Sequence, residues 1–137
     1  MTPDIDSLAD AECIKLVTFR KSGAEVATPV WFVVAEGRIF VRTLTHFGKV
    51  KRLRNNAAVR FAACDWDGDV SGPWFNGQAE LIPGSDDRIA SIDNLLDGRY
   101  GERRAEMNRL IESQRLETVF VAITPSPGGE HRAGDGS

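Results

Sequence analysis

The run from Val26 to Ala35 constrains the fold of this chain more than any other segment. It is apolar at both odd and even positions and rich in β-branched side chains, a pattern typical of a strand that is covered on both faces. Glu36-Gly37 then predicts a hairpin turn into a second strand, Arg38 to Leu44. The longest apolar run, Val30 to Ala35, has six residues, far fewer than the ~20 that a membrane-spanning helix needs. We therefore expect no membrane insertion.

Four further strands are expected, and the apolar positions between them indicate helices. The strands are Cys13 to Arg20, Ala58 to Trp66, Trp74 to Ile82 and Thr118 to Thr124. A short helix is predicted from His46 to Asn55 with Thr45 as its N-cap, and two amphipathic helices follow Ser85 and Gly101. The second of these places Met107, Leu110 and Ile111 on one stripe.

These elements predict a mainly β (α+β) fold, with six antiparallel strands and a helical insertion. A closed or split β-barrel is favoured, because consecutive short strands would otherwise leave long apolar edges. No linker or repeat divides the chain, so residues 1–124 are expected to form a single domain. Residues 125–137 are rich in Gly, Pro and charge and are predicted to be a flexible C-terminal tail.

Charge is distributed unevenly along the chain. The net charge is −3, yet the segment from Arg38 to Arg54 contains six basic residues and no acid. A nucleic-acid-binding domain usually spreads positive charge over a whole face, whereas a small anionic ligand needs only a local pocket. The pattern therefore favours a small-molecule anion and argues against a nucleic-acid partner.

The segment from Val41 to Asn56 contains the strongest candidate site. On a helical wheel, Lys49 and Arg52 border the apolar stripe at the first helical turn, where free backbone N–H groups favour an anion. Gly48 permits close approach to the backbone. With Arg42 and Thr43 from the preceding strand end, Lys49 is predicted to bind a phosphate. Lys51 and Arg54 point elsewhere and are also explained as a solvated face.

A second candidate is Thr28-Pro29-Val30-Trp31, where a proline interrupts an apolar strand. The proline indicates an edge, a bulge, or a place where something other than a strand lies against the backbone. Trp31 and Trp74 are core or interface aromatics unless they border a pocket, in which case they would stack on a planar ligand.

Several kinds of chemistry are disfavoured by what the sequence lacks. His46 has no acidic neighbour within ten residues except Glu36 at that limit, and no second His or Cys at metal-binding spacing; the other histidine, His131, lies in the C-terminal tail. The chain therefore lacks a convincing histidine-based catalytic triad, and neither GxGxxG nor a P-loop motif occurs. Cys13 and Cys64 have no second cysteine close in sequence, which argues against a disulfide framework or a zinc site. We expect no metal and a reducing, cytoplasmic location.

The stretches VATPVWFVVAEGRIFVRT and GKVKRLRNNAAVRFAACDWDGDVSGPWFNGQAEL resemble the pyridoxamine 5'-phosphate oxidase-like split-barrel superfamily. The resemblance is strongest to its branch of F420-dependent flavin/deazaflavin oxidoreductases of the B type, and it covers roughly residues 10–124. In one departure, Ala57 stands where the family often has a proline.

The resemblance implies a homodimer with cofactor sites between the subunits. It places the cofactor phosphate at Lys49, Arg42 and Thr43 and the tricyclic ring along Thr28, Pro29, Val30 and Trp31. Gly48 and Lys51 complete the expected cofactor site, and Lys51, Arg52 or Arg54 would meet the acidic tail of F420. No catalytic side chain is predicted, because the cofactor itself supplies hydride chemistry.

The function expected from this resemblance is hydride transfer between F420 and a small conjugated organic substrate. FMN is the alternative cofactor, and a protein that binds or sequesters F420 or flavin without turnover is the alternative function. A basic helix that binds nucleic acid is a third, weaker hypothesis, which predicts affinity that falls steeply with salt.

Overall fold

A seven-stranded antiparallel sheet forms the body of the computed structural model, which describes residues 8, 10–44, 48–82 and 86–130. The strand order is β2-β1-β5-β6-β7-β4-β3. The strands are β1 Cys13–Phe19, β2 Glu25–Val30, β3 Val33–Ala35, β4 Arg38–Leu44, β5 Ala58–Cys64, β6 Phe75–Ile82 and β7 Thr118–Glu130. Three helices accompany them: α1 Gly48–Asn55, α2 Arg88–Tyr100 and α3 Glu102–Ser113.

The expectation of one strand from Val26 to Ala35 is wrong, and so is the count of six strands. The run is divided into β2 and β3, which lie at opposite edges of the sheet and pair with β1 and β4 respectively. Between them, the backbone N–H of Phe32 donates to the hydroxyl of Tyr100 at 3.0 Å rather than to a strand. Trp31 and Phe32 thus carry the chain from one edge to the other, and the sheet curls without closing.

Pro29 lies in an edge strand, where the lack of a backbone N–H donor costs little stability. Pro29 is opposite Lys15 in β2, an edge strand of the sheet. The prediction that Pro29 marks an edge is therefore confirmed.

The ends of other elements differ from the sequence predictions. β5 ends at Cys64 rather than Trp66, and β7 continues to Glu130, beyond the predicted end at Thr124. The predicted helix caps at Thr45 and Ser85, together with His46, lie outside the described residues. No helix in the described part of the chain is long and apolar enough to cross a membrane.

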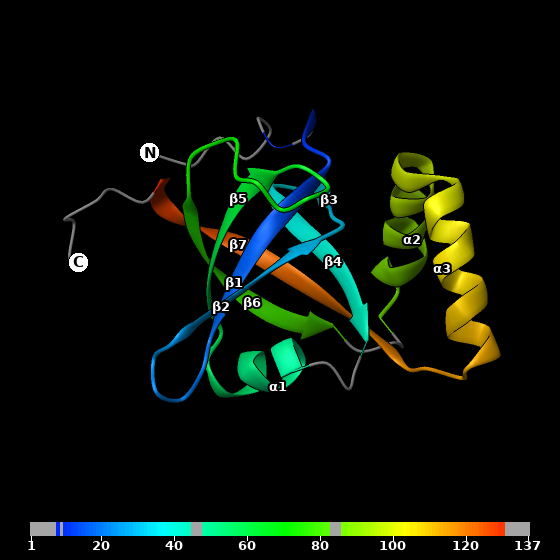
Figure 1. Cartoon of the computed structure of the whole chain (residues 1–137), viewed down its shortest axis with the longest axis horizontal. Helices are drawn as coiled ribbons and strands as arrows, with labels where there is room; N and C mark the ends of the chain where they lie inside the picture. The colour runs from blue at the N-terminus through cyan, green and yellow to red at the C-terminus, as the bar shows by residue number, and fades with distance from the viewer. Residues whose placement is uncertain (1–7, 9, 45–47, 83–85, 131–137) are drawn as a thin grey trace.

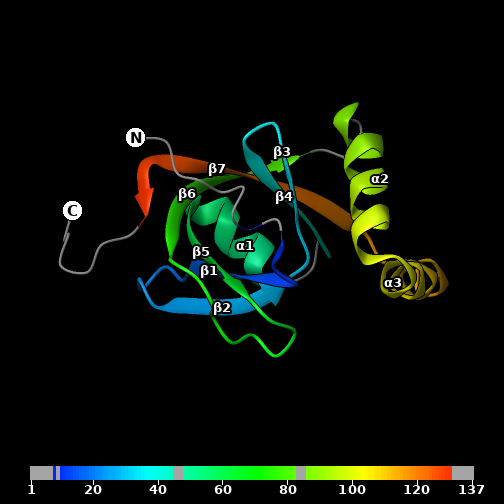
Figure 2. The same cartoon turned by 90° about the horizontal axis from the view of Figure 1, so that it is seen from above.

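Two apolar clusters fix the elements around the sheet. One fills the inside of the curled sheet, and Leu53 of α1 joins it at the end of the barrel that α1 covers (Figure 1). The other joins the outer face of the sheet to Ile92, Leu96 and Tyr100 of α2. The pair α2–α3 consequently stands beside β4, as Figures 1 and 2 both show.

Candidate functional site

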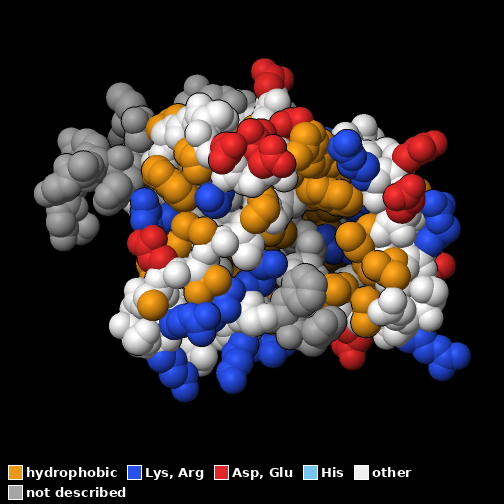
Figure 3. All heavy atoms as spheres, viewed as in Figure 1, with side chains coloured by type: hydrophobic (Ala, Val, Ile, Leu, Met, Phe, Trp, Pro, Cys, Tyr) orange, Lys and Arg blue, Asp and Glu red, His pale blue; other side chains and the backbone are white. Residues whose placement is uncertain are grey.

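A cavity of about 350 Å³ lies between the sheet, α1 and the α2–α3 pair. Figure 3 shows hydrophobic side chains gathered at a hollow between the barrel and the helices, with basic side chains near it. Its walls come from every layer of the fold: Cys13, Pro29, Val30, Trp31, Arg42, Thr43, Leu44, Lys49, Trp66, Leu96, Arg104, Met107, Asn108, Ile111 and Thr118.

Most residues of the predicted site meet in this cavity. Pro29, Val30 and Trp31 arrive from β2 and the crossover, Arg42 and Thr43 from the end of β4, and Lys49 from α1. The predicted site residues Thr28, Gly48 and Lys51 are absent from the lining.

Lys49 lies on the first turn of α1 and is partly buried. The buried residues Val50 and Leu53 set the rotation of this helix, as the helical wheel predicts. Burial lowers the pKa of the Lys49 amine, and the nearby charge of Arg52 lowers it further. A cation that has lost part of its hydration at a helix N-terminus favours contact with an anion.

Gly48 lies beside the side chain of Arg52 and does not line the cavity. A Cβ at Gly48 would lie 2.9 Å from Nη1 of Arg52. Arg52 turns toward β1, where its Nε donates to Thr18 Oγ1 at 2.7 Å. Lys51 and Arg54, by contrast, are exposed. Of the basic side chains of α1, only Lys49 therefore lines the cavity.

Arg42 and Thr43 lie in the same cavity but on opposite faces of β4. Val41, two residues before Thr43, packs in the cluster inside the sheet, whereas Phe40, two residues before Arg42, packs in the cluster beneath α2. Side chains alternate along a strand, so Thr43 faces inward, the side that α1 covers. Arg42 faces the helical pair.

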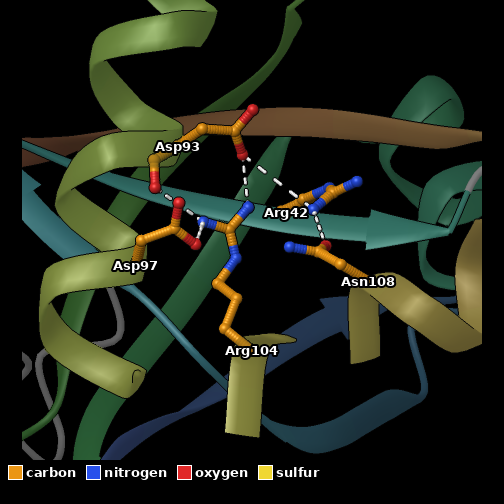
Figure 4. A network of polar contacts seen from close by, with 5 residues as sticks. All are labelled: Arg42, Asp93, Asp97, Arg104 and Asn108. Carbon is orange, nitrogen blue, oxygen red and sulfur yellow. Dashed lines mark hydrogen bonds and ion pairs between the residues drawn. The ribbon is translucent and has the colours of Figure 1, made fainter. Parts of the chain in front are cut away.

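A polar network holds Arg42 against the helical pair (Figure 4). Its Nη1 donates to Asn108 Oδ1 at 2.6 Å and lies 3.9 Å from Asp93 Oδ1. Asp93 and Asp97 also pair with Arg104, which is 3% exposed. Burial lowers the pKa of Arg42, and its buried Nε has no hydrogen-bond partner among the described residues.

The contribution of α2 and α3 to the site was not foreseen from the sequence. Met107 and Ile111, from the predicted apolar stripe of the second amphipathic helix, line the cavity, and so does Asn108. In the structure Met107 is 42% exposed. Helical periodicity predicts the apolar stripe of this helix. It cannot predict that Asn108 bonds to Arg42, because the two residues are 66 positions apart in the chain.

Tyr100 fixes one aromatic wall of the cavity. Its hydroxyl accepts the Phe32 N–H, and its ring stacks on Trp31 with centroids 4.9 Å apart and an interplanar angle of 13°. The rings of Trp66 and Tyr100 form an edge-to-face pair with centroids 6.2 Å apart, and Trp66 also lines the cavity. Trp74, in contrast, lies under the Arg60 guanidinium at 4.7 Å and outside the lining.

The two cysteines lie opposite each other on β1 and β5, although they are distant in sequence. Both are free and buried, and Cys13 also lines the cavity. Burial and the neighbouring Cys64 raise the pKa of Cys13 to about 11. No group of three or more His, Cys, Asp or Glu residues in the described ranges is placed to hold a metal.

No protein-family model and no curated protein matches the sequence. Solved structures match its fold. The heme storage protein HutZ from Vibrio cholerae has a TM-score of 0.70 at 14% identity, over 90% of this chain and 89% of that one. A candidate pyridoxamine 5'-phosphate oxidase from Listeria innocua has a TM-score of 0.63 at 16% identity, over 89% and 90%.

An F420 reductase matches with a TM-score of 0.59 at 16% identity, over 92% of this chain and 96% of that one. These similarities show that the chain has the fold of the pyridoxamine 5'-phosphate oxidase-like split barrels. The predicted resemblance is confirmed at the level of fold.

Proposed function

We propose that this chain is an oxidoreductase that binds coenzyme F420 in the cavity beside Lys49 and transfers hydride to a small conjugated organic acceptor. FMN is the alternative cofactor. One observation carries the proposal: an apolar cavity with aromatic walls has a partly buried lysine at its α1 end. The F420 reductase of the same fold adds support.

The residues of the cavity fit such a cofactor. A volume of about 350 Å³ lies within the usual range for small-molecule sites, ~300–1,000 Å³. Pro29, Val30 and Leu96 offer the apolar surface that a planar ring needs, while Lys49 offers a cation for a phosphate.

Each part of the site has a role in this proposal. Lys49 and Thr43 hold the phosphate, and the chain from Thr28 to Trp31 lies along the ring. Trp31, packed on Tyr100, keeps that wall rigid, while the α2–α3 pair excludes water. The bound cofactor supplies the hydride chemistry.

The preference for F420 over FMN rests on charge outside the cavity. Lys51 and Arg54 are exposed on the helix that carries Lys49. FMN has one phosphate and would leave both unused, whereas the acidic tail of F420 could pair with them. Exposed pairs of this kind each contribute only about 0–1 kcal/mol, so the tail would adjust affinity rather than create it.

A homodimer with the cofactor site near the subunit boundary belongs to the same proposal. Leu95, Met107 and Leu110 are 47%, 42% and 46% exposed on the helical pair, and Trp66 at the cavity is 41% exposed. A second copy that packs against this surface would bury these side chains and cover the cavity. Closed two-fold dimers are the commonest assembly of such domains.

A second candidate function is binding of F420 or flavin without turnover, and the heme storage protein of the same fold is the observation that favours it. An assay separates the two functions: reduced F420 is mixed with the protein and menadione, and its reoxidation is followed by absorbance. Hydride transfer predicts reoxidation at least tenfold faster than with Lys49→Ala or without protein. Tight binding without acceleration would support the storage function instead.

A further inference from the structure

We propose that Arg42 and Asn108 form a carboxylate-binding subsite at the helical end of the cavity, so that the substrate is an apolar conjugated carboxylic acid. That this ligand is a substrate rests on the proposed function. The subsite itself is defined by the contacts of β4, α2 and α3.

Among the cationic side chains that line the cavity are those of Lys49 and Arg42. Lys49 reaches it from α1, on the inward side of β4 where Thr43 lies, whereas Arg42 leaves the opposite face of β4 toward α2 and α3. The charges that act on Arg42 are those of Asp93, Asp97 and Arg104, all on the helical pair. On this arrangement we assign the phosphate to Lys49 and Thr43 and a second anion to Arg42, in place of the single phosphate site that the resemblance implies for all three residues.

The guanidinium of Arg42 is oriented by a neutral partner and has only a long contact with a carboxylate. Its 2.6 Å bond to Asn108 Oδ1 fixes its plane against a neutral group (Figure 4). Its contact with Asp93 is long, 3.9 Å, because the same Oδ1 atom pairs closely with Arg104. Asp97 also pairs with Arg104. Arg42 thus has only a long contact with a carboxylate that it shares with Arg104, and in a partly buried position this leaves its guanidinium able to bind a further anion.

The donor geometry suits a carboxylate. A guanidinium presents its remaining N–H groups in a planar fork that matches two carboxylate oxygens. Asn108 uses its oxygen toward Arg42, so its amide nitrogen stays a donor. Both side chains line the cavity.

The residues around this subsite determine what kind of ligand body can lie beside the carboxylate. Leu96, Met107 and Ile111 from the helices and Trp31 from the crossover form the neighbouring wall. Such a wall favours an apolar, planar body between the carboxylate and the proposed position of the cofactor ring.

The subsite is tested by equilibrium binding of 2-naphthoate and of neutral 2-naphthylmethanol to the full chain, followed by calorimetry and tryptophan fluorescence. We expect naphthoate to bind about ten- to a hundredfold more tightly than the alcohol, as a charge-assisted hydrogen-bonded contact predicts. Arg42→Gln should abolish this preference, and Arg42→Lys should keep only part of it. Arg109→Gln, an exposed change on the same helix as Asn108, should leave it intact.

Asn108→Asp is the second variant, because it keeps the size of the side chain and places a carboxylate on Arg42. Asn108→Asp should also remove the preference for naphthoate over the alcohol. It provides the test of the subsite if Arg42→Gln fails to fold. Equal binding of the two probes to the wild type, or an undiminished preference in Asn108→Asp, would overturn the subsite. So would loss of the preference in Lys49→Ala, since the probe would then occupy the phosphate position. Failure of the proposed function is seen separately, as absence of cofactor binding.

Discussion

Lys49 is the residue on which the proposed phosphate contact depends. It is partly buried at the cavity, whereas Lys51, two residues later on the same helix, is exposed and outside the lining. A charge-assisted hydrogen bond contributes about 1.5–3 kcal/mol. Lys49→Ala should therefore weaken cofactor binding about ten- to a hundredfold, as measured by fluorescence titration.

Lys51→Ala is the matched control for this change, because it removes the same charge from the same helix. We expect it to weaken binding no more than a few-fold, and less at high salt. Equal losses in the two variants would show that Lys49 contributes only general positive charge.

Cys13 gives the folded protein a defined response to alkaline pH. Its pKa is raised from 9.0 to about 11 in the folded state, so between these values the folded protein keeps a proton that the unfolded chain loses. The resulting stabilisation is complete below pH 9 and is lost as the pH rises to about 11. Urea unfolding across this range should show a steeper loss of stability in the wild type than in Cys13→Ala. Parallel pH profiles would contradict this.

At the scale of elements, α3 is held by charge more than by apolar burial. Arg104 is the only buried residue of α3, and it pairs with Asp93 and Asp97 of α2. Arg104→Ala should lower the free energy of unfolding by about 1–3 kcal/mol, between the values for exposed and fully buried pairs.

The loss of stability in Arg104→Ala should be confined to α3, and amide hydrogen exchange can show where it occurs. Amide protection should fall mainly in α3, while protection of the sheet amides should stay unchanged. Arg109→Ala, an exposed change on the same helix, should have little effect on either. A uniform loss of protection over the whole chain would indicate that the network supports the barrel rather than α3.

Sequence patterns predicted the strands well and their connections poorly. β4 was predicted with its observed bounds, because alternation and the turn at Glu36-Gly37 are local signals. The division of the run Val26–Ala35 could not be read in the same way, since it depends on Tyr100, 68 residues after Phe32 in the chain. Pro29 indicated only that β2 is an edge strand.

The site was predictable to the same extent. The helical wheel placed Lys49 at the buried flank of α1, because Val50 and Leu53 set the rotation locally. The pairing of Arg42 with Asn108 and Asp93 depends on where α2 and α3 pack. The opposite orientations of Arg42 and Thr43 follow from strand alternation once β4 is known.

At the scale of the whole molecule, the exposed apolar side chains of α2 and α3 predict self-association. Sedimentation equilibrium should show a dimer of about 30 kDa from chains of 15.0 kDa. Leu110→Glu places a charge on this surface without touching the cavity lining, and it should shift the protein toward monomer. A wild-type monomer at all concentrations would remove the dimer from the proposal.

Titration of the full chain with F420 and with FMN, at low and high salt, tests the central claim most directly. We expect saturable binding of one F420 per chain, with tighter binding than FMN. Because the exposed cations of α1 act through screened charge, the difference should shrink as salt rises. Tighter binding of FMN would retain the split-barrel flavin site and refute the choice of F420. No saturable binding of either cofactor would contradict the account itself.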